Sequence, residues 1–102
     1  MTTRVLIIDD HPVVRAGIRT LLQQADGVRV VGQAGSGEEA LADLARTRPD
    51  VVLCDLRLGA GLDGVATTKA ISRTAARPAV LILTTYDNDA DIVRAVEAGA
   101  VG

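Results

Sequence analysis

Short apolar runs alternate with amphipathic segments along the whole chain. Aliphatic and β-branched residues dominate positions 4–8, 51–54 and 79–83, which predicts strands that are buried on both faces. Residues 28–34 predict one more strand. Between the strands, apolar residues recur at the spacing of one helical face. Strands and helices that alternate with short connections predict an α/β fold, with a parallel sheet and helices on both of its faces.

The first expected helix begins near Pro12, which suits the first helical turn because its missing N–H needs no partner there, and it ends at Gly27. Its expected apolar face consists of Val14, Ile18, Leu21 and Ala25. Ser36, three residues before Glu39, forms a capping-box pattern that predicts a second helix at residues 37–47. The inner positions expected for that helix are Ala40, Leu41, Leu44 and Ala45.

Two further helices complete the alternation. Residues 64–74 predict a weaker helix, whose expected inner positions are Val65, Thr68, Ile71 and Ala75. Asp87 or Asn88 can cap a last helix that runs to Ala98. Gly99 then provides a left-handed cap at its end.

Composition narrows the class of protein. The chain has 102 residues, 48% of them hydrophobic, which suits one domain with a packed core. The net charge is −2 with both signs interspersed, so neither a nucleic-acid surface nor a membrane surface is indicated. The single Cys54 cannot form an internal disulfide, and we find no signal peptide and no apolar run of membrane-spanning length. We therefore expect a cytoplasmic domain that does not contact a membrane.

Polar residues follow three of the expected strands. Asp9 and Asp10 end the first, Asp55 ends the third and Thr84 ends the fourth. The carboxyl ends of parallel strands share one edge of the sheet, where ligands bind near a switch in strand order. Three carboxylates repel each other unless a cation lies among them, and oxygen-only ligands suit Mg²⁺. The pattern predicts a Mg²⁺ site in which the third carboxylate can act as a nucleophile toward phosphorus.

Each acid also has a plainer interpretation. Acids after strands are ordinary loop residues, and Asp10 alone suits a cap for the helix that Pro12 opens. The coincidence of such residues at three strand ends favours the shared site.

In four segments the chain resembles the receiver domain of bacterial two-component response regulators: IIDDHP, VVLCDLRL, LILTTYDND and the closing EAGAVG. The DDHP and LTTYDND stretches resemble the NarL/FixJ branch most, whose receivers precede a LuxR-type helix-turn-helix DNA-binding domain. The resemblance covers essentially the whole chain. It implies the receiver fold, a flavodoxin-like doubly wound parallel sheet, with four strands and the start of a fifth present here.

The resemblance implies a role for each matching acid. Asp55 matches the phosphoacceptor, which takes a phosphoryl group from a sensor histidine kinase. Asp10 matches the acid that contacts Mg²⁺ directly, and Asp9 the acid that usually acts through water.

Two residues from later loops also match, and two more are expected near the pocket. The backbone carbonyl of Arg57 matches the third protein ligand of Mg²⁺. Thr84 matches the hydroxyl that hydrogen-bonds the phosphoryl group and couples it to the surface of the fourth helix. Thr85 and Tyr86 are expected to border the pocket, although Tyr86 is equally well explained as a partly exposed packing residue.

Two features depart from the family. The loop after the acceptor has Gly59 where the family usually has Pro, with one extra residue. The family's active-site Lys follows the fifth strand, which lies beyond Gly102, and Lys69 cannot replace it.

The expected domain, residues 1–102, is therefore a receiver that lacks its last strand and helix, and the DNA-binding output domain is absent. The strand at 79–83 would then become a sheet edge. We expect this fragment to self-associate, as a homodimer or by exchange of segments.

Other residues near these motifs invite different interpretations. His11 is expected to be a loop histidine, because one His without a His or Cys partner is a weak metal motif. Cys54 is expected to pack as a small buried hydrophobe. The acids at 87–91 are expected to begin a helix rather than form a calcium loop, since the required Gly and distal Glu are missing.

The resemblance implies a phosphorylation-controlled switch that regulates a DNA-binding output and has no enzymatic activity beyond self-phosphotransfer and slow autodephosphorylation. Two alternatives remain open. One is a Mg²⁺-dependent phosphohydrolase with Asp55 as nucleophile, although no matching lysine follows the later strands. The other is a degenerate receiver that acts only as a protein-interaction module, against which the intact acid triad argues.

Overall fold

The computed structural model describes residues 2–55, 58, 61–75, 78–83 and 96–101. Strands and helices alternate along it as the apolar pattern predicts. In chain order the elements are β1 (Thr3–Ile8), α1 (Pro12–Gln23), β2 (Val28–Ala34), α2 (Gly37–Thr47), β3 (Val51–Asp55), α3 (Gly64–Ser72) and β4 (Ala79–Leu83). No helix in the described part of the chain is long and apolar enough to cross a membrane.

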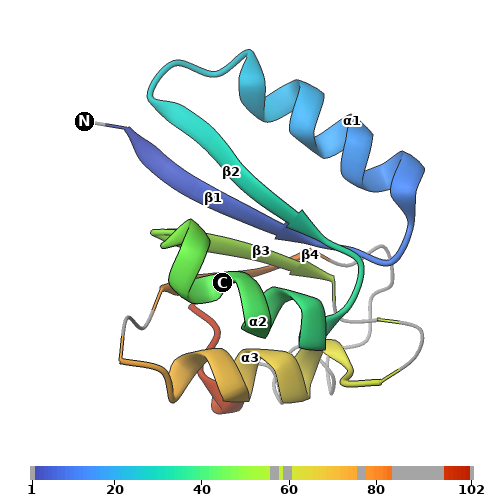
Figure 1. Cartoon of the computed structure of the whole chain (residues 1–102), viewed down its shortest axis with the longest axis vertical. Helices are drawn as coiled ribbons and strands as arrows, with labels where there is room; N and C mark the ends of the chain where they lie inside the picture. Colours follow the sequence, from blue (N-terminus) through green and yellow to red (C-terminus); the bar gives the residue numbers. More distant parts are fainter. Residues whose placement is uncertain (1, 56–57, 59–60, 76–77, 84–95, 102) are drawn as a thin grey trace.

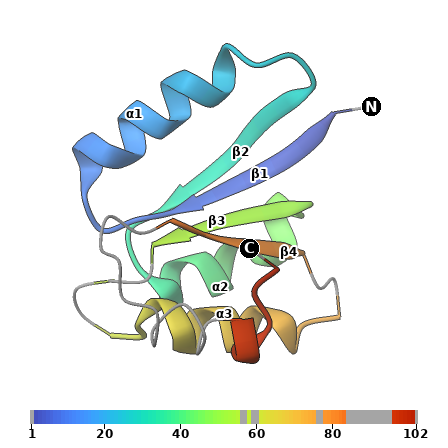
Figure 2. The same cartoon turned by 180° about the vertical axis from the view of Figure 1, so that it is seen from behind.

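The four strands form one parallel sheet in the order β2-β1-β3-β4. As Figure 1 shows, α1 lies on one face of this sheet, and α2 and α3 lie on the other; the view from behind in Figure 2 agrees. The chain moves outward from β1 to β2 and then crosses back to β3. The strand order therefore switches between β1 and β3, which is where ligands bind in open sheets of this kind.

The main core lies between the sheet and the pair α2 and α3. The buried residues of this cluster are Leu6, Ile8, Ala34, Ala40, Val52, Cys54, Leu58, Ile71, Val80 and Ala100. Leu41 and Leu44 pack against it from α2, as expected, whereas Ala45 is exposed. In α3, Thr67 and Thr68 are fully buried together with Ile71. The prediction for Ala75 is wrong, because α3 ends at Ser72 and Ala75 is exposed beyond it.

On the opposite face of the sheet, the described part of the chain supplies only α1. No residue of α1 is buried, and its expected inward residues Val14 and Leu21 are 45% and 70% exposed. Ala25 lies beyond the end of α1 and is exposed, and only Ile18 is half-buried. The prediction of a buried apolar face is thus wrong. Among the described elements, α1 makes its main contacts with β2 and β1, and its apolar residues stay largely exposed.

The ends of the helices follow the expected capping chemistry. The Ser36 hydroxyl accepts a hydrogen bond from Glu39 N at 3.1 Å, which satisfies a backbone donor that the helix itself leaves open. Asp63 does the same for α3, accepting from Ala66 N at 2.7 Å. Gly99 has φ of +125°, so the left-handed conformation expected there is confirmed.

The start of a fifth strand is also present. Val101 N donates to Val80 O at 2.9 Å, on the side of β4 that does not face β3, and Ala100 is buried. The last described residues therefore begin to extend the sheet beyond β4, as the sequence predicts.

Candidate functional site

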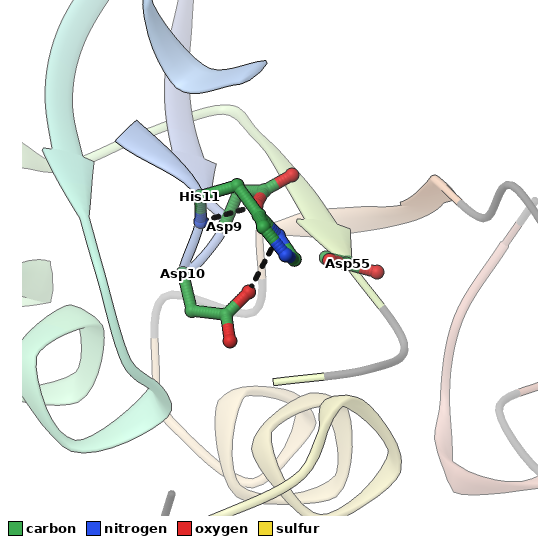
Figure 3. Close-up of side chains that lie close together, drawn as sticks. All are labelled: Asp9, Asp10, His11 and Asp55. Carbon is green, nitrogen blue, oxygen red and sulfur yellow. Dashed lines mark hydrogen bonds and ion pairs between the residues drawn. The ribbon is translucent and has the colours of Figure 1, made fainter. Parts of the chain in front are cut away.

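The register of the sheet brings the acids of two strand ends together. In the parallel pair of β1 and β3, Ile8 lies opposite Cys54. The residues that follow, Asp9 and Asp55, therefore leave the sheet side by side at the switch in strand order. Figure 3 shows the side chains of Asp9, Asp10, His11 and Asp55 gathered beyond these two strand ends. One ligand atom from each of the four lies within 4.8 Å of the others.

The three carboxylates differ in their exposure. Asp9 is 5% exposed, and its backbone N–H continues the ladder to β2 by donating to Ala34 O at 3.0 Å. Asp10 and Asp55 are half-buried. The pocket thus has an anchored acid at its base and two acids that water and a small donor can reach.

His11 contacts both acids of the pair. Its backbone N–H donates to Asp9 Oδ1 at 2.8 Å, and its Nδ1 lies 3.1 Å from the same oxygen. The same Nδ1 lies 2.8 Å from Asp10 Oδ1. The hydrogen bond with Asp9, followed by the charge of Asp10, raises the pKa of His11 above its ordinary value.

Asp10 does not cap α1. The N-cap position is His11, and no side chain there makes a capping hydrogen bond. The plainer interpretation of Asp10 as a helix cap is therefore wrong. Its Oδ1 atom is instead buried and lies 2.8 Å from His11 Nδ1.

This donor set fits a divalent cation such as Mg²⁺. Three carboxylates within reach of one point repel one another. A hard cation relieves this repulsion, because Mg²⁺ binds through a few carboxylates and keeps several waters.

Cys54 directly precedes Asp55, the candidate phosphoacceptor, but its thiol does not react. Its side chain is fully buried. Burial, and then the charge of Asp55, raises the pKa of the thiol to about 12, so it stays protonated and a poor nucleophile. The expectation of a small buried hydrophobe is confirmed.

Four predicted site residues lie outside the described residues: Arg57, Thr84, Thr85 and Tyr86. The structure does show where the strand before Thr84 ends, since Leu83 lies opposite Asp55 in the β3–β4 pair. The roles of these four residues stay predictions.

Sequence reasoning missed a contact between α2 and the loop that precedes α3. Glu38, in the first turn of α2, accepts a hydrogen bond through Oε1 from Leu62 N at 2.9 Å, 24 residues away. It ties α2 to the loop that follows the acceptor. Gly61 has φ of +78°, a left-handed conformation that favours glycine, and it lies against the Glu38 carboxylate. An acid in the first turn of a helix is common, so Glu38 did not stand out in the sequence. The glycine at position 61 was the one local sign of this contact.

The response regulator receiver domain family matches residues 5–102. Among curated relatives, the response regulator GacA of Pseudomonas viridiflava is 41% identical over 99 residues, which is 97% of this chain and 46% of that protein. The response regulator protein VraR of Staphylococcus aureus is 40% identical over 97% of this chain and 47% of its own length. The chain thus spans just under half the length of these two relatives.

Solved structures support the same family assignment. A LuxR-family two-component response regulator from Aurantimonas superposes with a TM-score of 0.92 at 37% identity, covering 100% of this chain and 72% of that one. The flavodoxin-like parallel sheet expected from the resemblance is confirmed by this match and by the strand order.

Proposed function

The chain belongs to the response regulator receiver family, and from this premise we propose that Asp55 accepts a phosphoryl group from a sensor histidine kinase in a Mg²⁺-dependent reaction. Receiver domains are phosphoacceptors rather than enzymes in the ordinary sense. The observation that carries the proposal is the convergence of Asp9, Asp10 and Asp55 at the ends of two adjacent parallel strands.

Asp55 supplies the nucleophile. A carboxylate oxygen of Asp55 forms the new O–P bond while the P–N bond to the kinase histidine breaks, and the departing imidazole takes up a proton. Asp55 is half-buried at the end of β3, so the donor can reach its carboxylate. The rigid β1–β3 register holds that carboxylate beside Asp9 and Asp10.

Asp9 and Asp10 would hold Mg²⁺ together with Asp55 and the carbonyl of Arg57. The ion supplies charge neutralisation for the transferring phosphoryl group when it is bound. The hydrogen bonds from His11 N to Asp9, and from Asp9 N to β2, keep the anchored acid in place. Thr84 is proposed to hydrogen-bond the phosphoryl oxygens, with Thr85 and Tyr86 at the border of the pocket.

The whole protein's role is part of the same proposal. The chain spans just under half the length of two curated response regulators, and their greater length supports an output region outside the receiver. We further propose that this output is a helix-turn-helix domain that binds DNA and regulates transcription in the cytoplasm, in line with the LuxR family named for one structural neighbour. Phosphorylation of Asp55 would control that output.

Intact mass after incubation with a small-molecule phosphodonor tests the proposal. We expect a gain of one phosphoryl group that requires Mg²⁺ and is lost in Asp55→Asn. Asp26→Asn is the matched control, because Asp26 is an exposed acid outside the pocket. The measurement is repeated on the natural protein that contains this chain. Labelling of Asp55→Asn at the wild-type level, or labelling that does not need Mg²⁺, contradicts the proposal.

A further inference from the structure

A groove lies at the edge of the sheet opposite the acidic pocket, and we call it the basal groove. Its volume is about 620 Å³, within the range of small-molecule sites. Asp50 comes just before β3 and Asp55 ends that strand, so about 16 Å of extended chain separates the groove from the proposed acceptor. The residues that line the groove are Leu41, Leu44, Ala45, Arg48, Pro49, Asp50, Thr74 and Ala75.

The body of the basal groove is apolar. Leu41 and Leu44 lie about one turn apart on α2 and are half-buried, so part of each side chain still faces water. Pro49 is buried just before β3, and Ala75 is exposed beyond the end of α3. Covering apolar surface that faces water is favourable. These residues therefore favour a ligand with an apolar body.

Arg4 already pairs with the acceptors at the end of α2. Its guanidinium donates to Thr47 O at 2.7 Å and to Arg48 O at 3.2 Å. Its backbone N–H donates to Asp50 Oδ2 at 2.8 Å. A cationic ligand would have to compete with Arg4 for these oxygens.

The Arg48 side chain, in contrast, is a charged group of the groove without a partner. Its guanidinium forms no ion pair or hydrogen bond with any residue that the structure describes. Its backbone has φ of +46°, an uncommon left-handed conformation for a residue with a side chain. Arg48 N donates to Leu44 O at 2.9 Å and Arg48 O accepts from Arg4, so this conformation is held from both sides. The backbone that carries the unpaired cation is thus fixed at the rim of the groove.

We propose that the basal groove binds a small organic carboxylate with an apolar body, such as a medium-chain acid, whose carboxylate pairs with the Arg48 guanidinium. A planar guanidinium matches a carboxylate with two parallel hydrogen bonds. The apolar body of the ligand covers Leu41 and Leu44. Asp50 lines the same groove with the opposite charge, so it weakens the attraction for an anion. This site is separate from the proposed phosphoacceptor and does not depend on it.

Leucine-methyl NMR of the natural protein that contains this chain tests the proposal, with decanoate below its micelle concentration as the probe. We expect the signals of Leu41 and Leu44 to shift and to saturate as decanoate is added. The signal of Leu6, which is fully buried in the core, is expected to stay in place. Shifts that do not saturate, or that are confined to other leucines, overturn the proposal.

Two charge changes at the rim should act in opposite directions. We expect Arg48→Gln to weaken decanoate binding by about threefold, because it removes the charge that pairs with the carboxylate. Asp50→Asn, which keeps an oxygen acceptor for Arg4, should strengthen binding. Arg46→Gln is the matched control, since Arg46 is exposed, lies 3.2 Å from Asp43 and does not line the groove. Equal effects of Arg48→Gln and Arg46→Gln overturn the proposal.

A second copy of the chain is the other candidate occupant. In that case the signals of Leu41 and Leu44 shift with protein concentration in the absence of decanoate, and this result also overturns the proposal. Phosphorylation at Asp55 is measured separately by intact mass, so its failure is distinguished from a failure of decanoate to bind.

Discussion

At the scale of single residues, burial decides the chemistry of two neighbours in β3. Cys54 points into the core below the sheet and is fully buried, whereas Asp55 lies at the strand end and is half-buried. Side chains alternate along a strand, so adjacent residues meet different surroundings. One step in sequence therefore separates a buried, protonated thiol from the half-buried carboxylate proposed as the phosphoacceptor.

The buried thiol should make the stability of the fold depend on pH. Burial raises the pKa of Cys54 to about 12, whereas an unfolded thiol ionises near about pH 8.5. Between these values the folded chain keeps a proton that the unfolded chain loses, so stability falls as pH rises. Above about pH 9, the free energy of unfolding should fall with pH more steeply in the unmodified chain than in Cys54→Ala. We expect the two slopes to differ by roughly 1 kcal/mol per pH unit.

Urea denaturation at a series of pH values measures both slopes. The cavity left in Cys54→Ala lowers its stability at every pH, but it does not contribute to the slope. Equal slopes in the two proteins are incompatible with a thiol that stays protonated in the fold.

At the scale of elements, the contact between α2 and α3 depends on a glycine. A Cβ at Gly37 would collide with the Thr67 side chain, which is fully buried. The Thr67 hydroxyl cannot turn away freely, because it donates to Asp63 O at 2.7 Å. The two helices therefore approach as closely as they do because residue 37 has no side chain.

We expect Gly37→Ala to destabilise the fold by about 1–3 kcal/mol, the usual cost of overpacking. Gly17→Ala is a matched control, since Gly17 lies in α1 with nothing within 4 Å of its Cβ position. It should stabilise by about 0.5–1 kcal/mol, because alanine is a better helix former. Thermal denaturation of both variants checks the contrast, and a Gly37→Ala variant as stable as Gly17→Ala would show that α2 and α3 separate easily.

The helices and strands also show which structural features can be predicted from local sequence patterns. The apolar runs located all four strands, and the acids that end β1 and β3 located the pocket. The capping signal at Ser36 fixed the start of α2. These features are local, so the chain reveals them without its tertiary structure.

The predictions that were wrong concern contacts between segments that are distant in sequence. Helical periodicity predicts which residues share a face but not how much of that face a neighbour covers, and so Val14 and Leu21 were wrongly expected to be buried. Thr67 is buried because α2 approaches it, and Glu38 reaches a loop 24 residues away. Such contacts depend on the packing of distant segments, which no local pattern encodes.

At the scale of the whole molecule, the face of the sheet that carries α1 should drive self-association. Leu81 of β4 is 37% exposed, opposite Leu53 of β3, on the face where α1 makes its main contacts with β2 and β1. Val101, which pairs with β4, is 69% exposed. We expect light scattering to show a mass that rises above the monomer with concentration.

Leu81→Lys should shift this association to higher concentration, because a charge on the face must be desolvated in the complex. Val13→Lys is the control, since Val13 is 85% exposed on α1 rather than on the sheet. A monomeric mass at crystallisation-level concentration would rule out the association, and an equal effect of both variants would place it elsewhere.

The parallel register of β1 and β3 has a consequence for the order of events during folding. Asp9 and Asp55, which form the two halves of the pocket, lie far apart in sequence. At the other end of the same strand pair, a hydrogen bond between Arg4 and Asp50 spans 46 residues. That loop must close before Asp9 and Asp55 meet, and non-local pairing of this kind slows folding. The acids therefore come together only as the central strands pair, so their mutual repulsion opposes that pairing, and a cation bound between them would offset it.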